Sequence, residues 1–101
     1  MMEYTVDRLQ VKRYVTRQQM GAAAAAEAMA LLRRLIADKG RVNAMFAAAA
    51  SQNELLEGLA QAELDWSRVN AFHMDNYIGL PMDAPQQFSS FLTRALFGRV
   101  P

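Results

Sequence analysis

The chain has 101 residues, a formal net charge of +1 and no cysteine. The absence of cysteine excludes disulfides and thiolate metal sites, and the near balance of charges shows no electrostatic pattern for binding nucleic acid or an anionic membrane. Because 52% of the residues are hydrophobic, we expect one small globular α/β domain over residues 1–101.

The N-terminal residues lack the basic and apolar regions of a signal peptide. The alanine-rich stretch that starts at Ala22 is interrupted by Glu27, Arg33 and Arg34, which makes it too polar to cross a membrane. We therefore expect no membrane partner and a cytoplasmic location.

The first predicted elements are a strand and a long helix. Residues 9–15 alternate between apolar and polar side chains, which predicts a half-buried edge strand. Thr16, with Gln19 three residues later, is typical of a capping box that begins a helix. We expect this helix to run to about Lys39 and to end at Gly40, which suits the left-handed position after a helix.

Two further strands and two helices follow in alternation. The near-continuous apolar run at residues 42–48 predicts a strand that is buried on both faces. Ser51 and Glu54 fit a second capping box, for a helix that reaches about Leu64. A strand is expected from Val69, and a last helix from Pro85. The order β-α-β-α-β-α predicts a short parallel sheet with helical crossovers.

The loop at residues 49–52 is the first candidate binding site: Ala49, Ala50, Ser51 and Gln52. A strand that leads into a helix N-terminus presents backbone N–H groups and the positive end of the helix dipole, which together bind phosphate. Phosphate loops usually contain glycine, and this loop contains alanine. From the residues alone, the favoured interpretation is that Ser51 is an N-cap.

Asp75 is the second candidate, because open α/β sheets place their chemistry at the carboxyl ends of strands. A carboxylate there can abstract a proton from a carbon next to a carbonyl. The structural alternative is that Asp75 caps the turn before Gly79. His73 leaves the same face of the strand, but no third metal ligand is evident, so we expect a packed or hydrogen-bonded histidine and no metal site.

The run Phe72-His73-Met74-Asp75-Asn76-Tyr77-Ile78-Gly79-Leu80-Pro81 resembles the signature of the glucosamine-6-phosphate deaminase/isomerase family. The residues from Ser51 to Phe97 follow the family's order and spacing. The resemblance implies a Rossmann-like three-layer α/β sandwich and a reaction that converts an amino-sugar phosphate into a keto-sugar phosphate and ammonia, without a metal or an organic cofactor. It implies that Asp75 transfers a proton and that the loop ending at Ser51 holds the sugar phosphate.

The chain also departs from the family pattern. Asn76 replaces an acidic residue, Ala50 replaces glycine or proline, and Gln87 replaces serine. The family's later glycine- and histidine-containing segment is absent, together with the ring-opening histidine and a basic residue that binds phosphate. The resemblance therefore implies an N-terminal fragment of the enzyme that is inactive alone and binds a hexose phosphate weakly or not at all.

An incomplete sheet would leave an apolar edge and face uncovered, so we expect a homodimer that covers this surface. The alternative interpretation is a non-catalytic, self-associating α/β module without ligand chemistry. Trp66, Phe72, Phe88, Phe91 and Phe97 are expected to pack in the core.

Overall fold

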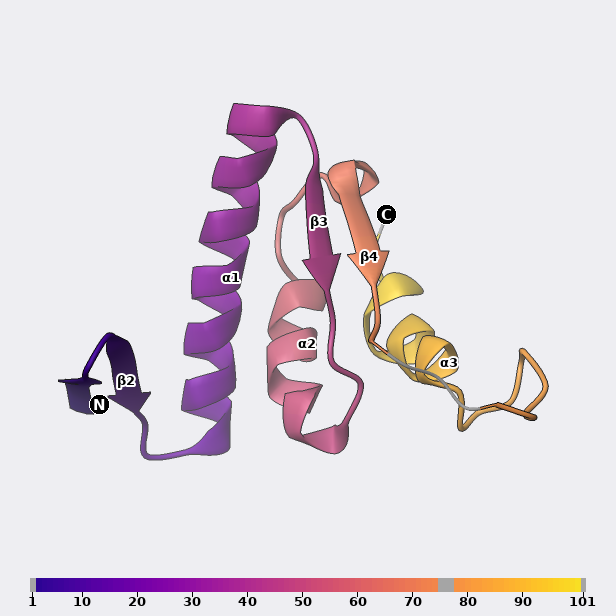
Figure 1. Cartoon of the computed structure of the whole chain (residues 1–101), viewed down its shortest axis with the longest axis horizontal. Coiled ribbons are helices and arrows are strands. Elements are labelled where there is room, and N and C mark those ends of the chain that lie inside the picture. The colour runs from indigo at the N-terminus through magenta and orange to yellow at the C-terminus, as the bar shows by residue number, and fades with distance from the viewer. Residues whose placement is uncertain (1, 75–77, 101) are drawn as a thin grey trace.

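A computed structural model describes residues 2–74 and 78–100. Its longest elements are one 23-residue helix and two short two-stranded sheets (Figure 1). The strands and helices are β1 (Met2–Val6), β2 (Leu9–Arg13), α1 (Arg17–Lys39), β3 (Val42–Met45), η1 (Ala50–Gln52), α2 (Asn53–Ala60), η2 (Trp66–Arg68), β4 (Val69–Phe72), α3 (Phe88–Leu92) and η3 (Thr93–Phe97).

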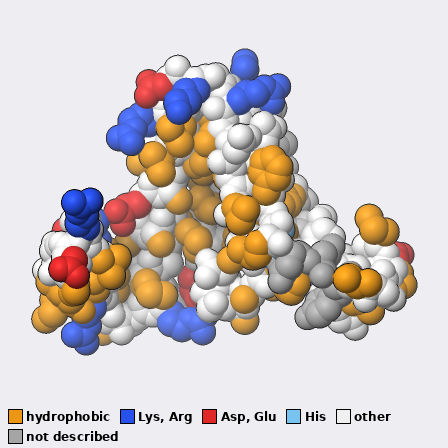
Figure 2. Space-filling model, in the orientation of Figure 1, with side chains coloured by type: hydrophobic (Ala, Val, Ile, Leu, Met, Phe, Trp, Pro, Cys, Tyr) orange, Lys and Arg blue, Asp and Glu red, His pale blue; other side chains and the backbone are white. Residues whose placement is uncertain are grey.

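The strand expected at residues 9–15 is present as β2, but it does not join the parallel sheet. It pairs antiparallel with β1, from Val6 opposite Leu9 to Met2 opposite Arg13. A turn of two residues connects the strands, and closing such a short loop costs little chain entropy. This hairpin lies to one side of α1 and carries exposed hydrophobic side chains (Figures 1 and 2).

α1 has the ends that the sequence predicts. The hydroxyl of Thr16 accepts a hydrogen bond from the Gln19 amide at 3.1 Å. Gly40 is left-handed, with φ of 78°, and its amide donates to the Ile36 carbonyl. Although α1 is long, no helix in the described part of the chain is apolar enough to span a membrane.

β3 and β4 form the predicted parallel pair, with α2 in the crossover between them. Val42 lies opposite Val69 and Met45 opposite Phe72. The Phe46 amide extends the pairing by donating to the Phe72 carbonyl at 2.8 Å. The α/β class is confirmed, although the parallel sheet of the described residues has two strands where the alternation predicted three.

The hydrophobic core lies between this sheet and the helices. Val42 and Phe46 are buried on the helical side, whereas Asn43 and Met45 are exposed on the opposite face. The described residues thus supply the sheet and one helical layer of a Rossmann-like sandwich. The buried core residues are Ala25, Phe46, Leu56, Leu59, Trp66, Leu92 and Leu96.

The C-terminal helix begins later than Pro85. Two successive turns, in which the amide of Ala84 bonds to Pro81 and that of Gln87 to Ala84, occupy the segment before it. Gln87 keeps an extended backbone, with φ of −61° and ψ of 139°, so α3 starts at Phe88. It continues as the π-helical η3, where the Gly98 amide donates to the Thr93 carbonyl at 2.7 Å.

Candidate functional site

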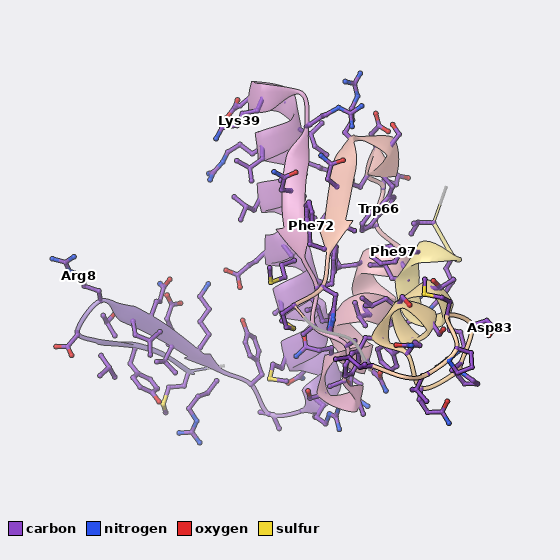
Figure 3. The ribbon with its side chains drawn as sticks, turned by 45° about the vertical axis from the view of Figure 1, so that its right-hand side comes forward. Arg8, Lys39, Trp66, Phe72, Asp83 and Phe97 are labelled. Atoms are coloured by element: carbon purple, nitrogen blue, oxygen red, sulfur yellow. The ribbon has the colours of Figure 1, made fainter. Side chains whose placement is uncertain are left out.

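The carboxyl ends of β3 and β4 lie side by side at one edge of the sheet. Their equal length and in-register pairing bring residue 46 next to residue 72. The loop 46–52 and the segment that follows Phe72 therefore leave the sheet at the same edge (Figures 1 and 3). Open α/β sheets bind ligands outside such an edge, which is where the sequence placed the site.

The loop at residues 49–52 forms a single 3₁₀ turn. Ala49 is extended, and its carbonyl accepts a hydrogen bond from the Gln52 amide at 2.9 Å. The Asn53 amide donates to the Ala50 carbonyl. Two of the amides at the start of α2 are thus used within the turn. The amides of Ala50 and Ser51 and the Ser51 hydroxyl have no protein partner among the described residues.

Ser51 does not cap α2, contrary to the interpretation that the residues alone favoured. The 3₁₀ turn moves the cap position to Gln52, and no side chain bonds to the free amides there. The helix also ends at Ala60, four residues before the expected Leu64. Because the Ser51 hydroxyl is exposed and does not bond to a backbone amide of α2, it is free to bond to a ligand.

Arg17, which the sequence analysis did not single out, reaches this loop from the start of α1. Its Nη2 donates to the Ala50 carbonyl at 3.1 Å and to Glu54 Oε2 at 3.0 Å. A cation in the first turn of a helix opposes the helix dipole. This unfavourable position is the one feature of the sequence that could have indicated a distant bonding partner for Arg17.

Gly21 allows α1 to lie against the first turn of α2. A Cβ at this position would be 2.3 Å from the Glu54 Cβ and 2.9 Å from the Glu54 carbonyl carbon. These distances are shorter than any side chain tolerates, so the glycine fixes how closely α2 and its preceding loop approach α1. The sequence showed only a glycine at the start of an alanine run.

His73 follows β4 directly and packs as the sequence favoured. Its ring is tilted by 33° to that of Phe88, with 4.8 Å between the ring centroids. Within residues 2–74 and 78–100, no three His, Cys, Asp or Glu side chains gather to hold a metal ion. A cavity of about 220 Å³ lies between the end of β4 and the C-terminal helix; it is lined by Ala71, Phe72, His73, Ser89, Leu92, Thr93 and Phe97.

Asp75 lies outside the described residues. Its proposed role and its distance from Ser51 therefore stay predictions. The structure describes the flanking residues on both sides, Met74 and Ile78, and both are exposed.

Among residues 2–74 and 78–100, the carboxylates with lowered pKa lie away from this sheet edge. The hydroxyl of Ser67 donates to Asp65 and lowers the pKa of that carboxyl, at the turn that begins β4. The Arg99 guanidinium lowers the pKa of Glu57 on α2. A larger hollow of about 470 Å³ between α1 and α2 is lined by Glu54 and Glu57, and their negative charge is unsuited to a phosphate.

Two curated proteins named glucosamine-6-phosphate deaminase are similar to this chain, although no family model matches it. The protein from Arthrobacter sp. (strain FB24) is 36% identical over 89 residues, covering 82% of this chain and 32% of its own length. The protein from Streptococcus sanguinis (strain SK36) is 28% identical over 74 residues, covering 73% of this chain and 31% of its own. The chain thus spans about a third of the length of these relatives.

The fold has a counterpart among solved structures. A crystal structure described as a putative 6-phosphogluconolactonase from Neisseria gonorrhoeae FA 1090 superposes with a TM-score of 0.74 at 21% identity. The match covers 83% of this chain and 36% of that one. At this identity the likeness concerns the fold. The solved structure thus shows the fold, and the two curated relatives show that the chain is similar to the glucosamine-6-phosphate deaminase/isomerase family over about a third of the length of its members.

Proposed function

We propose that the chain carries one part of the active site of a glucosamine-6-phosphate deaminase-like enzyme. This part, which we call the half-site, consists of the sugar-phosphate loop 49–52 and Asp75. The observation that supports this most directly is the parallel pairing of β3 and β4. It brings the loop 49–52 and the segment after Phe72 to one sheet edge. The ligand class is a hexose phosphate, with its phosphate at the loop and its sugar toward the end of β4.

In this proposal the phosphate is bound by the amides of Ala50 and Ser51, the Ser51 hydroxyl and the positive end of α2. Arg17 adds a cation near the Ala50 carbonyl, and Glu54 offsets part of that charge. The alanine Cβ atoms keep the phosphate farther from the backbone than glycine would. We therefore expect weak binding, with a Kd of about a millimolar.

Asp75 is the proposed proton-transferring residue, which takes a proton from the carbon next to the sugar carbonyl. The family's ring-opening histidine and later phosphate-binding basic residue have no counterpart in this sequence. For that reason we propose that these 101 residues do not deaminate glucosamine 6-phosphate on their own.

Titration with glucose 6-phosphate, followed by amide chemical shifts, tests the binding site. Shifts at Ala50 and Ser51 that are absent with glucose support a phosphate site. Ala50→Gly should tighten binding severalfold because the backbone can approach the phosphate, while Ala47→Gly, in the same loop outside the site, should not. Equal shifts with glucose, or no shifts at Ala50 and Ser51, would contradict the proposal.

Ammonia release from glucosamine 6-phosphate tests the catalytic part. We expect no release above the rate of a protein-free control. A rate that is present in the chain and lost in Asp75→Asn would show that the half-site is a working enzyme and that the expected inactivity is wrong.

A second candidate function is self-association of a non-catalytic module. The observation that favours it is the open face of the parallel sheet, where Met45 is 65% and Phe72 is 53% exposed at paired positions. Two such faces would bury each other in a homodimer. Light scattering at high micromolar concentration should give a dimer that Phe72→Lys dissociates, whereas a strictly monomeric mass excludes this function.

A further inference from the structure

Gln87 is buried, although Pro85 and Gln86 just before it are exposed. Only 3% of its surface is accessible. Its side-chain amide donates to the carbonyls of Leu80 and Pro81, each at 3.3 Å. These two carbonyls lie at the far end of the segment that leaves β4, so the start of α3 is joined to that end.

The Oε1 of the same side chain is buried and has no hydrogen-bond partner in the described part of the chain. Buried amides are normally satisfied at both atoms. An apolar side chain of the same length would fill this space without the unpaired acceptor. Core packing alone therefore does not explain why a glutamine occupies this position. The two hydrogen bonds that its side chain donates do explain it.

The adjacent residue holds the near end of the same segment. The Phe88 ring lies against the His73 ring, which directly follows β4. The start of α3 therefore contacts His73 through Phe88, and Leu80 and Pro81 through Gln87.

We propose that Gln87 is a positioning residue, which sets where Leu80 and Pro81 lie relative to the start of α3. Its importance for ligand binding rests on the proposed function above, but its effect on the segment does not. The structural consequence is that loss of the Gln87 amide should release the loop before α3 while the core remains intact.

Gln87→Met is the decisive variant, because methionine has a similar length and removes both the donor and the unpaired acceptor. Native-state hydrogen exchange at the Ala84 amide, which bonds to the Pro81 carbonyl at 3.0 Å, reports on the loop. Exchange at the Phe46 amide, bonded to Phe72, reports on the sheet. We expect loss of the two Gln87 hydrogen bonds, each long at 3.3 Å, to make exchange at Ala84 about tenfold faster and to leave exchange at Phe46 unchanged.

Gln86→Met is the matched control, since Gln86 is exposed and should leave both rates unchanged. Should Gln87→Met fail to fold, Gln87→Asn keeps a buried amide that is one methylene too short to reach the carbonyls, and the same selective acceleration is expected. Unchanged exchange at Ala84 would overturn the proposal. Equal acceleration at Ala84 and Phe46 would overturn it as well, because Gln87 would then be part of the core alone.

A glucose 6-phosphate titration of Gln87→Met separates this proposal from the proposed function. Weaker binding than in the unmodified chain, together with selective exchange at Ala84, supports both. If the unmodified chain binds no glucose 6-phosphate, the half-site is refuted, and the exchange data still decide the role of Gln87.

Discussion

The two small sheets of this molecule have the same number of strands and very different surroundings. β1 and β2 are joined by a tight turn, and Val6 and Leu9 on one face of their hairpin are 52% and 65% exposed. β3 and β4 are separated by a helical crossover, and Val42 on their helical face is buried. The strands of the first sheet thus pair because they are close in the chain. The strands of the second sheet pair because one face of their sheet is buried against the helices.

The two sheets differ in where their stability comes from. A lone two-stranded hairpin is marginally stable in water, because neither of its faces buries much apolar surface. The parallel pair has one face covered by α1 and α2 and shares their core (Figure 1). Mutations on the covered face should therefore cost stability, and equivalent mutations in the hairpin should cost little.

The largest expected contrast is between two leucines. Leu56→Ala, at a position that is 2% exposed, should lower the free energy of unfolding by about 2–5 kcal/mol because it leaves a cavity beneath the sheet. Leu9→Ala, in the exposed hairpin, should change it by less than about 0.5 kcal/mol. Urea unfolding of both variants measures this, and similar losses would refute the distinction between the sheets.

A smaller loss is expected for Gly21→Ala, which tests how closely the helices beneath the parallel sheet approach each other. The added Cβ would overlap Glu54, so α2 must move away from α1 at a cost of about 1–3 kcal/mol. Alanine at an exposed helical site would instead stabilise by up to about 1 kcal/mol. Thermal unfolding that shows a gain in stability would mean that the helices separate without cost.

The next contrast is between two residues with positive φ, one in the turn before β3 and one in the turn between β1 and β2. Gly40 has φ of 78° and open space where a Cβ would lie, so Gly40→Ala should cost about 1 kcal/mol through the backbone alone. Asp7, with φ of 53° in the hairpin turn, is the counterpart, and Asp7→Gly should leave global stability unchanged. Urea unfolding checks both, and a large effect of Asp7→Gly would show that the hairpin contributes to the core.

The smallest effect is expected for the ion pair that joins the hairpin to α1. Lys12 Nζ lies 2.9 Å from Glu27 Oε1, and this carboxylate raises the pKa of Lys12 above its usual value of 10.5. Because the pKa is raised on folding, the stability that this ion pair contributes is complete below pH 10.5. It is lost as the pH rises through the folded-state pKa of Lys12. Lys12→Met should shift hairpin amide resonances and leave the unfolding midpoint unchanged; a lowered midpoint would contradict this.

Features that depend on a few consecutive residues were predictable from the sequence. The Thr16 cap, the Gly40 end of α1 and the strand starting at Val69 are set by local side-chain and backbone preferences. The parallel pairing followed from the alternation of strands and helices, and the family resemblance from the motif after Phe72. The antiparallel β1 partner of residues 9–13 was not predictable in the same way, because alternation indicates an edge strand without indicating which strand it pairs with.

The candidate site was predictable in its position and not in its details. The sequence indicated the loop that contains Ser51, but the 3₁₀ turn that removes its capping role depends on how α2 packs against α1 through Gly21. Arg17 reaches Ala50 across 33 positions of the chain, and Gln87 is buried with its amide bonded to the Leu80 and Pro81 carbonyls. Local sequence determined which segments are helix and strand, whereas contacts between distant segments decided which side chains meet, since those contacts form only when the core is packed.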